Sequence, residues 1–157
     1  MAISAGAEKD TRCGVKGMTK IIKEFEVEAL PERVFRVVSV PDKWPQWCGF
    51  VKRASSNGSD AHWVYDMGGM KVESDSKVSE LRENSVYEFR QTSGFMKSGA
   101  TRFDIRPSEK GSKVIWTTEY ELPFSYLGKI ADKLKARRQF EQAIERALKS
   151  LIQFLER

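Results

Sequence analysis

The chain has 157 residues and a formal net charge of +5, with 40% hydrophobic and 31% charged residues. This length suits one domain, and the composition excludes an intrinsically disordered chain. Its apolar runs are shorter than the roughly 18 residues of a membrane-spanning helix, and its first residues lack the basic and apolar regions of a signal peptide. We therefore expect a cytoplasmic protein.

Cysteine and histidine, the main ligands of zinc and iron sites, are scarce in this sequence. Two cysteines, Cys13 and Cys48, make neither a disulfide framework nor a metal set, and His62 is the single histidine. A zinc or iron site is therefore not expected, and we predict no metal and no cofactor.

The N-terminal part predicts a tail, a strand and two short helices. Residues 1–17 have no hydrophobic period and predict a disordered tail, so the single folded domain is expected over residues 18–157. Residues 19–29 alternate between apolar and acidic side chains, which is typical of a strand with one face in water. Pro31 fits the first position of a helix that ends before Pro41. Residues 42–47 predict a second short helical turn or a tight loop whose two tryptophans plug one end of a sheet.

Six further runs predict a meander of antiparallel strands. Short turns rich in Gly, Asn and Asp separate them, with no helical stretch between. The predicted strands are 50–56, 61–67, 70–81, 85–93, 99–107 and 114–122. Together with the first strand they make a seven-stranded antiparallel sheet.

Alternation within these strands separates the two faces of the sheet. Charges of both signs fall on one face, as expected for a face in water, and His62 falls there too. The other face is apolar and aromatic with a few hydroxyls and an amide. We expect Cys48 to be a packing residue beside Trp47.

The last 30 or so residues predict one long helix. With Ile144 at the centre of a helical wheel, seven apolar residues lie within about 80° of it; they are Ile130, Leu134, Phe140, Ala147, Leu148, Leu151 and Leu155. This stripe needs a large apolar surface, and the sheet is the one available. The segment from Ser125 to Arg157 has eight Lys or Arg against four acids, and we interpret this excess of charge as a solvated face, with no specific nucleic-acid partner.

Lys133 and Arg137 interrupt this stripe, because both lie within about 20° of its centre. Two interpretations stay open. The helix end overhangs the sheet and both side chains reach water, or the two bases cap the mouth of a cavity and meet a polar or anionic head group.

The order of these elements resembles the helix-grip fold of the START-like superfamily, and most closely its polyketide cyclase/dehydrase-like (SRPBCC) branch. The motifs that carry the resemblance are short and span about residues 19–157; they are Ala29 to Phe35, Asp42 to Trp47, Glu80, Tyr120 to Pro123 and Ala147 to Leu151. The resemblance implies an α+β fold in which the sheet wraps around the long C-terminal helix. It also implies a cavity that holds a hydrophobic ligand.

The inward face supplies the candidate ligand-binding residues. Its polar members either hydrogen-bond one another in an ordinary core or line a cavity and orient a ligand. The candidates on the strands are Trp63, Tyr65, Phe89, Gln91, Thr101, Phe103, Trp116, Thr118 and Tyr120, and those on the helix are Lys133 and Arg137. Phe95, Met96 and Phe124 lie in glycine-flanked connections and are candidates for the entrance, where a transient membrane contact is a further expectation.

No catalytic motif accompanies these residues. The sequence has no nucleophile elbow, no phosphate-binding glycine loop and no paired inward carboxylates. We therefore expect a carrier or sensor of a lipid, isoprenoid or aromatic molecule and assign no catalytic residue. Two alternatives stay open: a metal-free cyclase or dehydratase using Arg137, Lys133 or Tyr120, and a ribosome- or protein-associated module using the basic helix. The sequence does not indicate the oligomeric state.

Overall fold

The computed structural model describes residues 3–4, 18–123 and 133–157, with the side chains of residues 18–123 and 135–157. In chain order the elements are β1 (Ile3–Ser4), β2 (Thr19–Val27), α1 (Pro31–Val38), the 3₁₀ helix η1 (Pro41–Gln46), β3 (Val51–Asn57), β4 (Asp60–Met67), β5 (Met70–Arg82), β6 (Val86–Gly94), β7 (Ser98–Ser108), β8 (Gly111–Glu121) and α3 (Lys133–Leu155). The seven predicted strands and the two short helices are all present.

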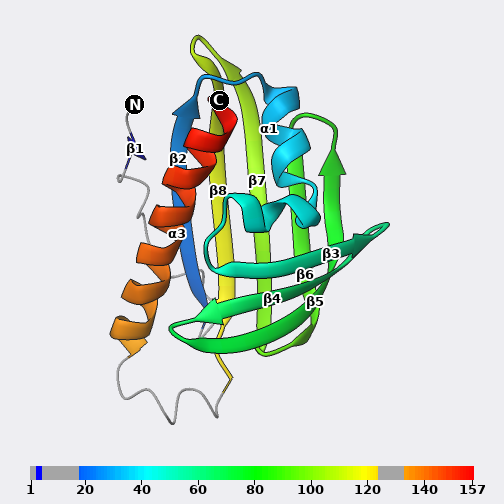
Figure 1. Cartoon of the computed structure of the whole chain (residues 1–157), viewed down its shortest axis with the longest axis vertical. Coiled ribbons are helices and arrows are strands. Elements are labelled where there is room, and N and C mark those ends of the chain that lie inside the picture. Colours follow the sequence, from blue (N-terminus) through cyan, green and yellow to red (C-terminus); the bar gives the residue numbers. More distant parts are fainter. Residues whose placement is uncertain (1–2, 5–17, 124–132) are drawn as a thin grey trace.

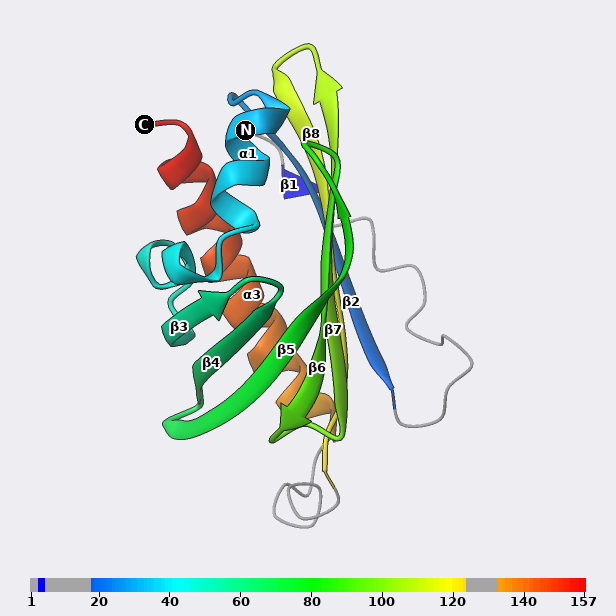
Figure 2. The same ribbon diagram turned by 90° about the vertical axis from the view of Figure 1, so that its right-hand side faces the viewer.

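The strands pair antiparallel in one sheet of order β1-β2-β8-β7-β6-β5-β4-β3. The sheet bends so that β3 to β5 cross in front of β6 to β8 (Figure 1), and α1 and η1 lie on the same side of β6 to β8 as α3 (Figure 2). Two register shifts in the pairing of β5 with β6 help this bend, since a bulge increases local twist. The architecture is the predicted helix grip.

β1 is an addition to the predicted topology. Ile3 and Ser4 pair with Phe25 and Glu24 at the free edge of β2. The prediction of a disordered tail over residues 1–17 did not include this pairing. Residues 5–17 lie outside the described part of the chain, so for them the prediction stays untested.

The predicted apolar stripe is buried against the sheet over the C-terminal part of α3, whereas Ile130 and the side chain of Leu134 lie outside the described part of the structure. Ile144, Leu148 and Leu151 are each at most 1% exposed and belong to the same core cluster as Phe25 and Trp116. Trp44 of η1 is also buried there, with its ring centroid 5.0 Å from that of Trp63 and its indole N–H donating to the Val38 carbonyl at 2.9 Å. The short helix therefore fills one end of the space between sheet and helix.

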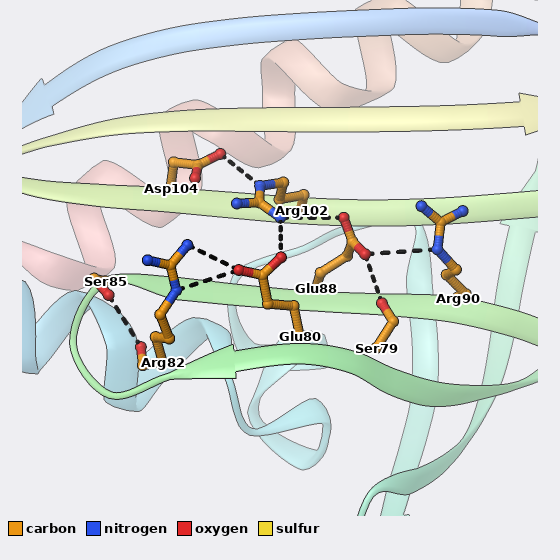
Figure 3. A network of polar contacts seen from close by, with 8 residues as sticks. All are labelled: Ser79, Glu80, Arg82, Ser85, Glu88, Arg90, Arg102 and Asp104. Carbon is orange, nitrogen blue, oxygen red and sulfur yellow. Dashed lines mark hydrogen bonds and ion pairs between the residues drawn. The ribbon is translucent and has the colours of Figure 1, made fainter.

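The outer face of the sheet carries a network of ion pairs (Figure 3). Arg102 is its centre, with Glu80 at 2.7 Å and Asp104 at 2.9 Å. Glu88 extends the network to Arg90 at 3.5 Å. This network faces away from α3 and matches the predicted alternation of opposite charges. Among the helices that the structure describes, none is long and apolar enough to cross a membrane.

Candidate ligand-binding cavity

A cavity of about 650 Å³ lies between α3 and the inner face of β4 to β8. Its residues come from η1 and the segment after it, from the β4–β5 hairpin, from β6 to β8 and from one flank of α3. On α3 these residues are Ala136, Gln139, Phe140, Gln142, Ala143, Arg146, Ala147 and Ser150. Three of them are alanines, whose small side chains leave space between helix and sheet.

Aromatic side chains form much of the cavity wall. Phe140 of α3 lies between Phe50 and Tyr120, with ring centroids 5.7 Å and 4.9 Å away and both contacts nearly perpendicular. Trp44, Phe89 and Trp116 line the cavity nearer the core. Edge-to-face contacts of this kind hold rings in fixed orientations. The wall is therefore apolar and well ordered.

Hydroxyl groups and an amide interrupt this apolar wall. The Trp116 indole donates to Thr118 Oγ1 at 3.0 Å, and Thr118 Oγ1 lies 3.4 Å from Thr101 Oγ1. The Gln91 amide donates to the Met96 carbonyl at 2.7 Å, which ties the β6–β7 connection to β6. The polar groups therefore pair with one another and also line the cavity, while their orientation of a ligand stays a prediction. A hydroxyl with one partner keeps capacity for another.

Gly94 lets the β6–β7 connection approach β5 at the cavity. Its φ is +138°, and a Cβ there would lie 2.5 Å from the Ser74 Cα. A side chain at position 94 would therefore push the end of β6 away from β5, the strand that carries the lining residue Ser74.

Two ionisable side chains inside the protein, the Tyr65 phenol and the Cys48 thiol, stay protonated. Burial raises the pKa of the Tyr65 phenol, against the opposing effect of its hydrogen bond with Ser74. Burial likewise raises the pKa of the Cys48 thiol, against hydrogen bonds from the Val51 and Phe50 backbone. Tyr65 lines the cavity and can donate a hydrogen bond there, whereas the buried thiol is not a nucleophile near neutral pH.

His62 lies outside the cavity, on the outer face where the alternation predicts it. Its ring nitrogens contact Asp75 at 2.7 Å and Glu73 at 2.9 Å. The hydrogen bond with Asp75, followed by that with Glu73, raises the pKa of His62. No group of three or more His, Cys, Asp or Glu residues that could hold a metal ion occurs in the described ranges.

Most predicted ligand-binding residues meet at this cavity. The lining includes Tyr65, Phe89, Gln91, Thr101, Trp116, Thr118 and Tyr120, and also the predicted entrance residues Phe95 and Met96. Phe124 and the side chain of Lys133 lie outside the described part of the structure.

Three predicted residues do not border the cavity. Trp63 and Phe103 have no exposed surface, and they support the wall from behind. Trp63 donates to Ser76 at 2.8 Å, and Phe103 stacks on Trp116 with centroids 5.1 Å apart. Arg137 is half-buried and absent from the lining, because the centre of the stripe points at the sheet while the cavity lies beside it.

The sequence prediction missed the flank of α3 that lines the cavity. Gln139, Gln142, Arg146 and Ser150 follow one another at helical spacing and lie about 120–200° from Ile144 on the wheel. From the sequence alone, their polar side chains indicate the face of the helix that is in contact with water. The nearby small residues Ala136 and Ala143 were the available signal, since they leave room that a larger side chain would fill.

Comparisons with known proteins agree with this architecture. The chain matches the family model described as polyketide cyclase / dehydrase and lipid transport over residues 18–156. No curated protein matches it significantly.

Solved structures share the fold at low identity. The protein TTHA0849 from Thermus thermophilus is 22% identical with a TM-score of 0.73, covering 85% of this chain and 94% of that one. A START superfamily protein from Mycobacterium smegmatis is 18% identical with a TM-score of 0.63, covering 88% and 98%. Major latex-like protein 151 of Panax ginseng is 13% identical with a TM-score of 0.63, covering 87% and 98%.

The START-like resemblance of the sequence is thus confirmed, both by the fold and by a family match over nearly the whole chain. The chain belongs to the polyketide cyclase/dehydrase and lipid transport family.

Proposed function

We propose that the protein binds a hydrophobic small molecule of lipid, isoprenoid or aromatic polyketide type in this cavity, as a carrier or sensor. The observation that carries the proposal is a cavity of about 650 Å³ with aromatic walls and a few hydroxyl groups. Small-molecule sites usually measure about 300–1,000 Å³ and combine an apolar lining with a few polar groups. Membership of a family described by cyclase, dehydrase and lipid transport supports the same class of ligand.

The hydroxyl groups of the cavity wall favour binding without turnover. A cyclase or dehydratase needs a group near the substrate that gains or loses a proton in the working pH range. Burial raises the pKa of Tyr65, so its phenol stays protonated. The hydroxyls of Thr101 and Thr118 do not titrate in this range. These groups suit the orientation of a ligand oxygen by hydrogen bonds.

Filling the cavity tests this proposal. Ala143 of α3 lines the cavity, and Ala143→Phe places a ring in the space. Gln153→Phe is the matched control, because Gln153 is exposed on the same helix and outside the lining. Dodecanol is the probe, with binding followed through the fluorescence of the tryptophans.

We expect dodecanol to bind the wild-type protein and the control variant alike, and to bind Ala143→Phe at least tenfold more weakly. Mass spectrometry of the native protein as purified supplies a second measurement, in which we expect a bound apolar molecule in the wild type and less of it in Ala143→Phe. Equal binding of dodecanol by all three proteins would mean that dodecanol binds outside this cavity. No binding by any of them would overturn the proposed function.

A further inference from the structure

The charge arrangement along α3 deepens the proposed function, on which this inference rests. Glu141 and Glu145 point to β2, where Lys23 binds them at 3.2 Å and 2.8 Å. Arg146 lies on the opposite flank and lines the cavity. Glu141 and Glu145 are therefore engaged in holding α3 to β2, whereas Arg146 lies at the cavity.

Arg146 has no ion pair within the part of the chain that the structure describes. Of the basic residues on α3 whose side chains are described, it alone borders the cavity; the others are Lys135, Arg137, Arg138 and Lys149. It is also exposed, so its guanidinium reaches both the cavity rim and water.

Three residues with carboxylate side chains also line the cavity, but they are arranged differently. Asp66 accepts a hydrogen bond from the Gly69 backbone at 2.7 Å, and Glu73 contacts His62 at 2.9 Å. Glu119 is also among the lining residues, although along β8 it alternates with the inward residues Thr118 and Tyr120. None of these three is seen to pair with Arg146, which keeps its hydrogen-bond donors available.

Neutral polar side chains flank the guanidinium along the helix. Gln142 lies one turn before Arg146 and Ser150 one turn after it, and both line the cavity. Guanidinium, amide and hydroxyl groups together form a strip of donors about two turns long. The aromatic wall of Phe50, Phe140 and Tyr120 begins beside this strip.

We infer that the ligand is an amphiphile with an acidic head group, a carboxylate or a phosphate monoester. Arg146 binds the head group at the rim, Gln142 and Ser150 supply further donors, and the apolar part extends between the aromatic side chains. Arginine presents two parallel N–H groups that match both acids, and hydrogen bonds of this kind are roughly twice as strong as neutral ones.

The test compares three probes with the same twelve-carbon chain: laurate, dodecyl phosphate and dodecanol, each below its micellar concentration. The variants are Arg146→Gln and Arg146→Lys, with Arg137→Gln as the matched control on the same helix, outside the cavity lining. Tryptophan fluorescence gives the affinities, and thermal unfolding of each variant checks that the fold is kept.

We expect Arg146→Gln to lose about tenfold in affinity, or about 1.4 kcal/mol, for at least one of the two acids and nothing for dodecanol. The acid with the larger loss is the preferred head group. Arg146→Lys should retain part of the affinity, because it keeps the charge but loses the paired donors. Arg137→Gln should behave as the wild type.

An equal loss for acids and dodecanol, no loss for any probe, or the same loss in Arg137→Gln would overturn the assignment of Arg146. If one of these results is found while dodecanol binds the wild type and Ala143→Phe abolishes that binding, the proposed function stands and only this inference fails. If no probe binds the wild-type protein, the proposed function fails as well.

Discussion

On the flank of α3 that faces β2, two glutamates meet a lysine whose side chain is only 6% exposed. On the flank that faces the β4–β5 hairpin, polar residues of similar size border an open cavity. The two flanks lie on either side of the same buried stripe centred on Ile144.

The difference between the flanks comes from what lies opposite the helix. β2 provides Lys23 on its inward face, in line with Ile21 and Phe25, so the charges on that side are paired and close the structure. The hairpin provides Tyr65, Val72 and glycines, which pair with no charge on α3. On α3, the charged residues that face an opposite charge on β2 pack closely against that strand, whereas Arg146, which forms no ion pair among the described residues, borders the cavity.

Truncation of the buried stripe between the flanks should have the largest effect. Ile144→Ala and Leu151→Ala each remove apolar atoms from a site at most 1% exposed, and each should lower the free energy of unfolding by about 2–5 kcal/mol. Urea titration measures this loss. A loss below about 1 kcal/mol for both variants would mean that neither flank is anchored by the stripe.

Loss of the charge pairs on the closed flank should come next. Lys23→Met removes the ammonium group that Glu141 and Glu145 both bind and should cost about 1–3 kcal/mol, since hydrogen bonds to charged groups contribute about this much. Lys20→Met, on the same strand but on the outward side of its alternation, is the control and should cost less. If both variants lost equal stability in urea, the closure of this flank by Lys23 would be disproved.

The pH dependence of this pairing has a definite sign. Burial lowers the pKa of Lys23, but its hydrogen bonds with Glu145 and Glu141 outweigh burial and the net pKa is raised. The stabilisation is therefore fully present below the unfolded pKa of about 10.4 and is lost as pH rises through the higher folded value. The difference in free energy of unfolding between wild type and Lys23→Met, measured by urea titration, should persist at neutral pH and shrink as the pH rises above about 10.4.

Deletion of residues 1–17 should have the smallest effect. It removes β1, whose two residues cover the free edge of β2 beside the closed flank. The core and the Lys23 pairs stay intact, so the melting temperature should fall by no more than a few degrees. A larger fall in thermal unfolding would show that the N-terminal segment helps to close this side.

Local patterns in the sequence were enough to predict the elements and their inward faces. Strands show a period of two and helices one of 3.6, so Tyr87, Phe103 and Trp116 on the strands and Leu148 on the helix could all be placed on their inward faces. Turn residues gave the strand order along the chain, and antiparallel hairpins follow from short turns. The resemblance to START-like proteins then supplied the helix grip, which the family match and the related structures confirm.

The position of the cavity depended on tertiary structure. Periodicity gives the direction of a side chain relative to its own strand or helix, but not the distance to the element on the other side. Trp63 and Phe103 point inward as predicted and are covered by their neighbours, whereas Arg146 points away from the stripe and still reaches the cavity. Lys23 has inward parity, yet only the position of Glu141 and Glu145 on the packed helix shows how its charge is neutralised. The sequence by itself therefore determined the elements and their faces, and the packing of α3 beside the bent sheet decided which flank is closed and which is open.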